Sequence, residues 1–431
     1  MKQYNEYKDS GVKWIGEIPS HWKVRRLKTL LLKPLQYGAN SSGIPFSNNL
    51  PRYIRITDIT IDGKIKNFDK LSLSEEDATP YLLDNNDVLF ARSGATVGKT
   101  FIYKNEYGKS AFAGYLIKAS LKEEISPDLL FLYTQSDIYD LWKNSIFIQS
   151  TIQNIGADKY SQLLIPIAPL SEQQAIVTYL DAKVAKIDSF IATAEKKIAA
   201  LDELKQVTIS NAVTRGINPN VSMKDSGIPW IGMVPEHWEV SKIRSLFKLS
   251  NQKTKENNCT LLSLSQYTGV RLKSECANVG MFEAETTIGY NIVQKGQFVM
   301  NIMLAWNGSY SVSNYNGVIS PAYCVFDFIR NCNKKYFDYL LRLKAYSGAF
   351  KTLSKGLIDS RLRLYPDYFK TFPIVFPPVE EQNEIVAYID RKVAQIDKMK
   401  AAELAQIEKL KEYKQRLISD VVTGKVKVTN E

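Results

Sequence analysis

Residues 93–100 of this chain, SGATVGKT, combine the glycines, hydroxyl groups and lysine that proteins use to hold phosphates. The stretch is close to the Walker A motif, which requires four residues between its glycines and a helix after them. Here only three residues separate Gly94 from Gly98, and residues 100–103, TFIY, favour a strand. A hairpin that presents this loop to DNA is our preferred interpretation, and nucleotide binding through Lys99 in a degenerate phosphate loop over 93–100 is the alternative.

Further basic and amide side chains have the chemistry needed to contact DNA. Arginine and amide groups make bidentate hydrogen bonds to guanine and adenine, and lysine neutralises phosphates. In the first half of the chain the candidate DNA-binding residues are Arg55, Arg92, Ser93, Thr96, Lys99, Gln149, Gln153, Asn154 and Lys159. In the second half they are Asn301, Trp306, Asn307, Lys355, Arg361 and Arg363. For each of them the alternative is an ordinary solvated side chain.

No set of residues matches a known catalytic site. The two histidines, His21 and His237, each occur in the sequence P-x-H-W, and structural packing beside the tryptophan is the preferred interpretation. The four cysteines form no C-x-x-C pair, which favours buried or idle thiols in a reducing cytoplasm. A complete Walker A motif, HExxH, a nucleophile elbow and the N/D-P-P-Y/F motif of amino-group methylation are all absent. We predict no catalytic residue, no cofactor and no metal site.

The elements that must position the candidate residues are revealed by an internal repeat. The entry segments, 9–24 (DSGVKWIGEIPSHWKV) and 225–240 (DSGIPWIGMVPEHWEV), are identical at ten of sixteen positions. The helix segments, 169–188 (PLSEQQAIVTYLDAKVAKID) and 378–397 (PVEEQNEIVAYIDRKVAQID), are identical at twelve of twenty. The inserts between them, 25–168 and 241–377, look unrelated. A duplicated frame with two different inserts predicts one kind of task performed on two different targets.

The net charge of +11 is unevenly distributed along the chain. Lys and Arg exceed Asp and Glu by three over residues 1–170 and by eight over 221–377, whereas 171–220 and 378–431 are neutral. Basic surface on the insert-bearing parts indicates a polyanionic partner, and nucleic acid is the leading candidate. A generally basic protein without such a partner is the alternative.

The helix segments predict two long helices with a coiled-coil seam, because their apolar residues alternate in steps of four and three. The first seam consists of Leu180, Val184, Ile187, Ile191, Ala194, Ile198 and Leu201. The second consists of Ile389, Val393, Ile396, Ile407 and Leu410. Lys400 and Glu403 occupy its two middle positions, where we expect a local break or shift in packing. Ser171 is the expected N-cap of the first helix, and Gly216 is its expected stop.

Each stripe is most simply buried against the other helix. If the two halves are related by a pseudo-twofold axis, the helices pair antiparallel, and about 43 residues give a rod of roughly 64 Å. Association between chains through the coil is the alternative. Within the first insert, 53–60 (YIRITDIT) alternates like a half-buried strand, and 87–103 reads as a hairpin. The second insert follows the same plan, with a first strand in 261–270 and a hairpin in 296–310.

Taken in order, these features resemble the specificity subunit of type I restriction–modification systems. The matching residues are the W-I-G-x-[IV]-P-x-H-W openings, the D-V-L-F-A-R-S-G-A-T-V-G-K stretch, and the helix starts at Glu172-Gln173 and Glu381-Gln382. The resemblance implies that each insert is a target recognition domain reading half of a split DNA site. It also implies helices that act as a spacer and dock two methyltransferase subunits, with two restriction subunits as optional further partners. The second insert departs from the pattern because it lacks the A-R-S-G-x-x-G-K form.

The predicted fold is therefore α+β, with two pseudo-symmetric mixed α/β recognition domains joined by two long antiparallel coiled-coil helices. The expected domains are 1–170 and 217–377 for target recognition, and 171–216 and 378–431 for the spacer helices. By this interpretation the chain is a cytoplasmic, non-catalytic subunit that binds a bipartite double-stranded DNA site and has no membrane span. A coiled-coil adaptor without a DNA role is a further alternative.

Overall fold

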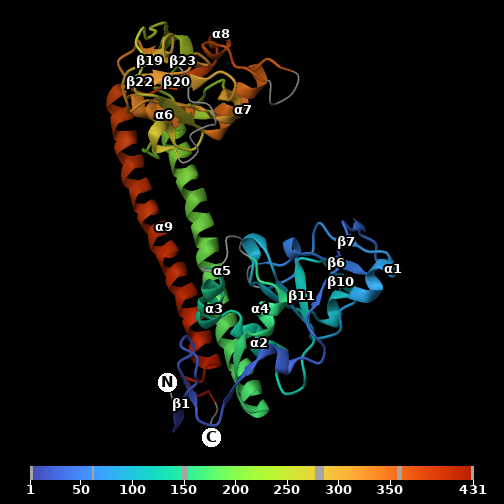
Figure 1. Cartoon of the computed structure of the whole chain (residues 1–431). Coiled ribbons are helices and arrows are strands. Elements are labelled where there is room, and N and C mark those ends of the chain that lie inside the picture. Colours follow the sequence, from blue (N-terminus) through green and yellow to red (C-terminus); the bar gives the residue numbers. More distant parts are fainter. Residues whose placement is uncertain (1–2, 61–62, 148–153, 277–285, 357–361, 429–431) are drawn as a thin grey trace. The chain divides into compact units, whose positions relative to one another are not determined.

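The computed structural model describes residues 3–60, 63–147, 154–276, 286–356 and 362–428. The chain divides into two compact units, of which unit 1 comprises residues 1–195 and 404–431 and unit 2 comprises residues 196–403. Each unit contains one insert, the first part of one long helix and the last part of the other (Figure 1). No helix within the described residues is both long enough and apolar enough to cross a membrane.

Unit 1 is built around a four-stranded antiparallel sheet of order β4-β11-β8-β9. Its strands are β4 (Gln36–Tyr37), β8 (Val88–Ala91), β9 (Thr100–Ile102) and β11 (Leu116–Ala119). A second sheet contains β5 (Ile44–Pro45), β6 (Arg52–Ile54), β7 (Leu71–Ser72) and β10 (Ser110–Phe112). Two-stranded pairs are formed by β1 (Tyr7–Asp9) with β2 (Glu17–Pro19), and by β3 (Lys23–Arg26) with β12 (Leu164–Ile167). The insert's helices are α1 (Glu75–Ala78), α2 (Pro127–Tyr133), α3 (Asp137–Phe147) and α4 (Ala157–Ser161), with 3₁₀ turns η1 (Leu27–Leu30), η2 (Ile56–Asp58), η3 (Thr79–Tyr81), η4 (Gly94–Thr96) and η5 (Asn105–Tyr107).

Unit 2 has a corresponding four-stranded antiparallel sheet of order β16-β23-β20-β21. Its strands are β16 (Phe247–Ser250), β20 (Phe298–Asn301), β21 (Tyr310–Val312) and β23 (Tyr323–Phe328). The two-stranded pairs are β13 (Met223–Asp225) with β14 (Met233–Pro235), β15 (Glu239–Lys242) with β24 (Pro373–Phe376), β17 (Leu262–Ser265) with β18 (Gly269–Leu272), and β19 (Asn291–Val293) with β22 (Gly317–Ile319). Its insert helices are α6 (Lys334–Leu341), α7 (Lys344–Leu353) and α8 (Pro366–Phe369), with 3₁₀ turns η6 (Ile243–Ser245), η7 (Lys273–Glu275) and η8 (Ala305–Asn307).

The two inserts therefore share a frame although their sequences look unrelated. In both units an inner strand of the main sheet, a 3₁₀ turn and a returning edge strand form a hairpin, as β8-η4-β9 and as β20-η8-β21. In both units the strand after the entry segment pairs with the strand before the long helix, as β3 with β12 and as β15 with β24. The prediction that the second insert follows the plan of the first is confirmed for the hairpin of the main sheet and for the strand pair that flanks each insert.

Each unit has its own main hydrophobic core. The core of unit 2 contains stacked aromatic rings, with Phe298 and Phe369 nearly parallel and their centroids 5.8 Å apart. The core of unit 1 includes the last turns of the second long helix, which contribute the buried residues Leu417, Ile418, Val421 and Val422. Burial of apolar side chains is the main stabilising contribution to such a core, so unit 1 depends on residues from both ends of the chain.

The two long helices are α5 (Leu170–Arg215) and α9 (Val379–Val422), and each is continuous. Along the predicted seam of α5, Leu180, Ile187, Ala194 and Leu201 are buried, and the seam residues between them are partly buried. Ion pairs across the seam show the direction of pairing within unit 2. Asp202 contacts Lys400 at 2.7 Å, and Lys205 contacts Asp397 at 2.8 Å. The residue numbers therefore rise along α5 while those of their partners fall along α9. Antiparallel pairing is confirmed.

The helix α9 passes through Lys400 and Glu403 without interruption, but the apolar packing of the seam breaks at these positions, as expected. Both side chains reach across to α5 instead, where Lys400 pairs with Asp202 and Glu403 pairs with Lys197. Charged residues therefore replace the apolar seam over about two turns. Exposed ion pairs of this kind contribute little stability, about 0–1 kcal/mol each, but they fix the register of the two helices.

The entry segments dock onto the long helices through a duplicated cluster of side chains. In unit 1 the Glu172 carboxylate lies 2.6 Å from His21 Nε2 and accepts a hydrogen bond from Trp22 Nε1 at 3.0 Å. In unit 2 Glu381 makes the same two contacts, with His237 Nε2 at 2.7 Å and with Trp238 Nε1 at 3.0 Å. Both tryptophans are buried, whereas both histidine rings are exposed. The histidines have a structural setting, as predicted, but the glutamate rather than the tryptophan is the partner of each ring.

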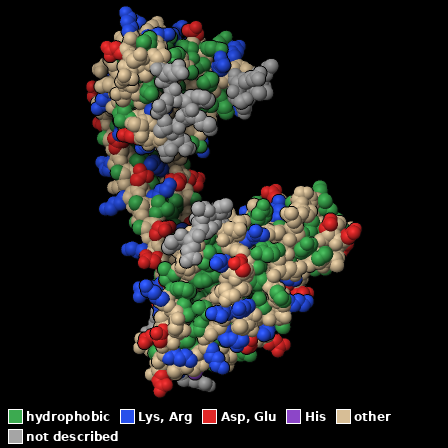
Figure 2. Space-filling view, in the orientation of Figure 1, with side chains coloured by type: hydrophobic (Ala, Val, Ile, Leu, Met, Phe, Trp, Pro, Cys, Tyr) green, Lys and Arg blue, Asp and Glu red, His purple; other side chains and the backbone are tan. Residues whose placement is uncertain are grey.

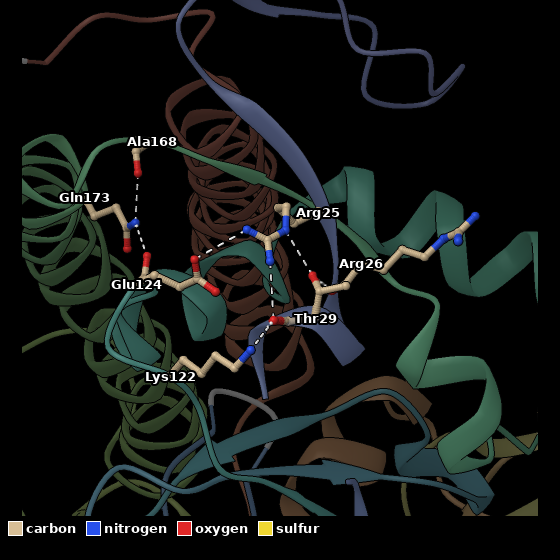
Figure 3. A network of polar contacts seen from close by, with 7 residues as sticks. All are labelled: Arg25, Arg26, Thr29, Lys122, Glu124, Ala168 and Gln173. Carbon is tan, nitrogen blue, oxygen red and sulfur yellow. Dashed lines mark hydrogen bonds and ion pairs between the residues drawn. The ribbon is translucent and has the colours of Figure 1, made fainter. Parts of the chain in front are cut away.

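The glutamine after each of these glutamates joins the long helix to the insert. Gln173 Nε2 donates to the carbonyls of Ala168 and Glu124 at 2.9 Å each (Figure 3). Its Oε1 accepts from Ser126 N at 2.8 Å. Gln382 repeats this in unit 2, where Oε1 accepts from Asn333 N at 2.8 Å. Both glutamines are buried. The glutamate of each E-Q dipeptide therefore attaches the start of the helix to the entry segment, and the glutamine attaches it to the insert.

Three local predictions are wrong. The segment 261–270, expected as one strand, contains the strand β17, a turn at residues 266–268 and the start of β18, which pairs back on β17. Gln173 N donates to Pro169 O at 2.9 Å, so α5 begins at Leu170 and Ser171 lies inside the helix rather than at its N-cap. The strand expected over 53–60 ends at Ile54 as β6, and the 3₁₀ turn η2 follows it. The turn forms because the Asp58 carboxylate accepts a hydrogen bond from Arg55 N at 2.8 Å, which closes the backbone over three residues.

Candidate nucleic-acid interface

In unit 1 the candidate residues gather at the end of the β8–β9 hairpin. Strand β8 ends at Ala91, and the loop turns through Gly94 and Gly98, whose φ angles of +73° and +85° favour glycine. Lys99 begins the return, with its carbonyl accepting from Ala91 N at 2.8 Å. Strand β9 follows directly, so the loop lacks the helix N terminus that phosphate-binding loops use. This geometry favours the DNA-facing hairpin over the nucleotide alternative.

A segment about 60 residues further along the chain reaches the same place. Ile155 N donates to Arg92 O at 2.8 Å, and Asn154 forms an isolated β-bridge with Ser93. The structure thus brings Arg92, Ser93 and Asn154 together, with Lys159 exposed on the adjoining helix α4. Two further candidates, Gln149 and Gln153, lie outside the described residues.

The Arg92 guanidinium is held in place by an aromatic ring. It stacks on Tyr37 with a distance of 4.9 Å from its central carbon to the ring centroid, a cation–π contact. The Arg92 Nε atom is buried and has no hydrogen-bond partner among the described residues. The Tyr37 hydroxyl also accepts a hydrogen bond from Ala157 N at 2.9 Å, at the start of α4. Tyr37 therefore orients both parts of the cluster.

Tyr37 and Tyr115 are candidate residues that sequence reasoning missed. The Tyr115 carbonyl accepts from Arg92 N at 3.0 Å, and its side chain is 61% exposed beside the cluster. Neither tyrosine lies in a motif, and both approach Arg92 only through the folding of the sheet. The only sequence signal was composition, because aromatic residues interleaved with basic ones are common on nucleic-acid-binding surfaces.

Arg55 has a different setting from the other candidates. Its guanidinium donates to both Asp58 oxygens, at 3.1 Å from Nε and 2.8 Å from Nη2, and Nη2 also donates to Asp69 O at 2.7 Å. The hydrogen bonds to Asp58 raise the pKa of Arg55 above its ordinary value. This guanidinium is engaged in holding η2, so Arg55 is a weaker candidate for a base contact than Arg92.

In unit 2 the equivalent hairpin places different side chains at the strand end. Asn301 is 4% exposed, and its side-chain oxygen accepts from Met303 N at 2.9 Å. Asn301 is therefore a weaker candidate for a base contact, because its buried amide shapes the turn. Trp306 donates from Nε1 to Met303 O at 2.9 Å, and the Lys351 ammonium lies 5.2 Å from the centroid of its ring system. Asn307 is exposed at the tip of the turn.

The pre-helix segment of unit 2 meets this hairpin as it does in unit 1. Leu364 N donates to Ile302 O at 2.9 Å, which corresponds to the bond between Ile155 and Arg92. Lys355 and Arg363 exchange two backbone hydrogen bonds of 2.9 Å, and both side chains are exposed. Arg361 lies outside the described residues. The two units thus present different exposed groups from equivalent backbone positions.

The surface around these clusters mixes both signs of charge. Lys and Arg side chains are interspersed with Asp and Glu on the visible face of the molecule (Figure 2). Several basic groups serve the scaffold, as Arg25 does by donating to Thr29 and Glu124 (Figure 3). On this face the basic side chains do not gather into one dense patch.

Metal and thiol chemistry find little support in the described part of the chain. It contains no group of three or more His, Cys, Asp or Glu side chains placed to hold a metal ion. The four cysteines are free. Burial raises the pKa of the Cys324 and Cys332 thiols to about 11, which suppresses the reactive thiolate at neutral pH.

The two inserts share one arrangement of strands but expose different side chains at the ends of equivalent strands. This combination is typical of a recognition protein with two modules. The family model of the type I restriction modification DNA specificity domain matches residues 19–201 and, a second time, residues 235–409. The chain therefore belongs to this family. Its role is DNA target recognition as a non-catalytic specificity subunit, which confirms the family and the role expected from the sequence.

Relatives and solved structures agree with this assignment. The chain is 26% identical over 404 residues to the type I restriction enzyme MjaVIII specificity subunit of Methanocaldococcus jannaschii, covering 87% of this chain and 86% of the relative. It is 23% identical to the EcoKI specificity subunit of Escherichia coli, covering 89% and 84%. A chain from a structure of type I R-M complex assembly has a TM-score of 0.69 at 16% identity, covering 95% and 99%. The HsdS subunit from Thermoanaerobacter tengcongensis has a TM-score of 0.51 at 17% identity, covering 95% and 98%. The two structures support the fold.

Proposed function

We propose that the chain recognises a bipartite duplex DNA target, with one half-site read by each insert. The observation that carries this proposal is the duplicated strand-end cluster. In unit 1 Arg92 O accepts from Ile155 N, beside the bridge between Ser93 and Asn154. In unit 2 Ile302 O accepts from Leu364 N, which follows Arg363 in the chain. One frame with different side chains is suited to two different base sequences. In domain terms, residues 1–170 and 217–377 read DNA, and residues 171–216 and 378–431 connect the two readers.

The exposed groups have distinct chemical tasks in this proposal. Arg92 and Asn154 are suited to guanine and adenine edges in the major groove, because each offers a bidentate hydrogen-bonding pattern. Arg363 and Asn307 take this role in unit 2. Lysines near the clusters, Lys159 and Lys355, neutralise phosphates and make the affinity dependent on salt. The tip of the unit 1 hairpin also contains Ser93, Thr96 and Lys99, and the tip of the unit 2 hairpin contains Trp306.

We further propose that two copies of a methyltransferase subunit dock on the long helices, where restriction subunits join in systems that also cleave. Each unit carries an exposed apolar residue on α5 and another on α9, both close to an ion pair that joins the two helices. In unit 1 these are Phe190 and Tyr413, next to the Asp188–Lys414 ion pair. In unit 2 they are Leu204 and Met399, next to the Asp202–Lys400 pair.

The offset of 209 residues that relates the helix segments maps Phe190 onto Met399 and Leu204 onto Tyr413. The two apolar pairs are therefore copies of one another. Exposed apolar groups of this kind are typical of protein-binding sites, and two copies of one site fit two identical partners.

The recognition proposal is tested by co-expressing the chain with a cognate methyltransferase subunit and mapping methylated adenines in the host DNA. We expect a split motif with two defined half-sites and an undefined spacer. Purified complex should bind a duplex containing this motif without added nucleotide, and the binding should weaken steeply as salt rises. Methylation without a split motif would overturn the bipartite proposal. Nucleotide-dependent binding would favour the phosphate-loop alternative, and no duplex binding would favour the adaptor.

The docking proposal is tested by placing a charge in each apolar pair. Phe190→Glu and Met399→Glu are each expected to reduce the complex from two methyltransferase copies to one, and the double variant to none, because a carboxylate is costly to bury in an apolar interface. The mass of the purified complex gives the stoichiometry. Ser189→Glu is the matched control, since it adds the same charge at an exposed neighbouring position. An unchanged mass in the double variant would contradict the proposed site.

A further inference from the structure

Unit 2 has an exposed aromatic side chain at the tip of a second hairpin, away from the strand-end cluster described above. Tyr267 lies between β17 and β18 and is 81% exposed. No other large hydrophobic side chain in the described ranges is as exposed. A tyrosine in this position contributes almost nothing to the core, so its ring is accessible to a partner.

The turn that carries Tyr267 is held rigidly. Ser265 pairs with Gly269 across the hairpin, and Tyr267 N donates to Ser265 Oγ at 3.1 Å. Gly269 has a φ of +69°, and a Cβ there would lie 2.7 Å from Ser311 Oγ and 2.9 Å from Arg342 Nη1. The positive φ and this close approach of the turn to the body of unit 2 both favour glycine.

The Arg342 side chain is hydrogen-bonded to the same turn. Its Nη2 atom donates to the carbonyls of Gln266 at 3.0 Å and Tyr267 at 3.1 Å. The nearby Asp338 carboxylate accepts from Ser311 Oγ at 2.9 Å and from Val312 N at 2.7 Å. The tip is thereby tied through Arg342 to the end of α6, and Asp338 in turn ties α6 to β21. A side chain presented on such a clamped turn loses little conformational freedom when it binds a ligand.

A groove of about 860 Å³ adjoins the tip and contains residues from both hairpins. Tyr267 and Gln266 line one part, and Trp306 and Asn307 of η8 line another. Lys344 and Lys351 of α7 contribute two cations to the lining. Aromatic rings beside lysines form a surface suited to bases and phosphates together.

We propose that Tyr267 is a wedge that inserts between bases of the half-site read by unit 2, while the groove receives the adjoining DNA backbone. This rests on the proposed function, and it adds a second point of contact to the hairpin tip at Asn307. Apolar and aromatic wedges of this kind partly unstack a base step and widen the surface that the protein contacts. The clamped turn supplies the stiffness that a wedge needs, and Lys344 and Lys351 neutralise the phosphates beside the distorted step.

The test uses the complete complex with a co-expressed methyltransferase and a duplex carrying the motif recovered by methylation mapping. The adenine analogue 2-aminopurine, which fluoresces more strongly when unstacked, is placed in turn at half-site positions other than the methylated adenine. We expect wild-type complex to raise the emission at one step of one half-site. Tyr267→Ala should abolish that rise and weaken duplex binding by about tenfold, a typical loss for one stacking side chain. Tyr267→Phe should retain both.

Ile329→Ala is the matched control, because it removes another exposed apolar side chain of unit 2 and should leave both readouts unchanged. If wild-type complex binds the duplex and Tyr267→Ala matches it in emission and affinity, the wedge is wrong and the proposed function stands. If Tyr267→Ala keeps its DNA affinity and loses a protein subunit of the complex, the wedge is also wrong and the tip is a protein contact. Absence of duplex binding by wild-type complex would instead overturn the proposed function itself.

Discussion

Replacing Arg92 by alanine is expected to remove the sequence preference at one base pair of the half-site read by unit 1. The guanidinium is stacked on Tyr37, and its buried Nε has no partner among the described residues. A bidentate arginine–guanine contact provides about 1–3 kcal/mol of discrimination, which corresponds to roughly 5–150-fold in affinity. The affinity for a duplex with the natural motif should fall within this range, and methylation mapping should show one relaxed position.

Two further variants separate base reading from general charge. Arg92→Lys keeps the charge but loses the planar fork, so it should relax the same position while preserving much of the salt-dependent affinity. Arg26→Ala removes a positive charge from an exposed site on β3 and should leave the motif unchanged (Figure 3). The other half-site serves as an internal control in every variant. A motif that stays fully defined in Arg92→Ala would contradict the assignment.

Removing one heptad from both long helices is expected to abolish methylation of the natural target and to shorten the spacer of any target still methylated. The segments 196–202 and 405–411 are equivalent under the 209-residue offset, so their joint deletion preserves the antiparallel register. After the deletion Glu195 would occupy the place of Asp202 opposite Lys400. Seven helical residues correspond to about 10 Å, or about three base pairs at roughly 3.4 Å each.

Methylation mapping again provides the measurement, because it reports the half-sites and the spacer together. The half-site sequences should remain as in the wild type, since neither insert is altered. The control exchanges the outward-facing residues of both heptads and keeps their length, so its spacer should not change. Circular dichroism checks that each variant retains its helices. Full methylation of the natural motif by the deletion variant would show that the helices do not set the spacing.

Periodicity and repetition made much of the frame predictable. The steps of four and three apolar residues identified both helices, and the hairpin over 87–103 followed from two β-rich runs around Gly94 and Gly98. The start of α5 and the end of β6 were mispredicted because each depends on a single hydrogen bond, from Gln173 N to Pro169 O and from Arg55 N to Asp58. Local propensity does not determine which of these competing bonds forms.

The candidate interface was predictable only in part. The hairpin tip and the segment at Asn154 were identified by residue type, but their meeting through Arg92 O and Ile155 N is a product of the fold. Asn301 was selected for its amide, and its burial depends on the packing of β20. Tyr37 and Tyr267 were missed because their value lies in stacking and in exposure, which residue type alone does not reveal.

The contribution of α9 to the core of unit 1 has a consequence for the order of synthesis. Unit 2 is one uninterrupted stretch, whereas unit 1 needs Leu417, Ile418, Val421 and Val422 to complete its core. Chains leave the ribosome N-terminus first, at about 5–20 residues per second, and domains fold as their residues become available. All of unit 2 therefore emerges before the last turns that close unit 1. The unit whose translation begins first is therefore the unit whose core is completed last. A chain that ends before residue 417 would leave the core of unit 1 incomplete, while all of unit 2 would be present.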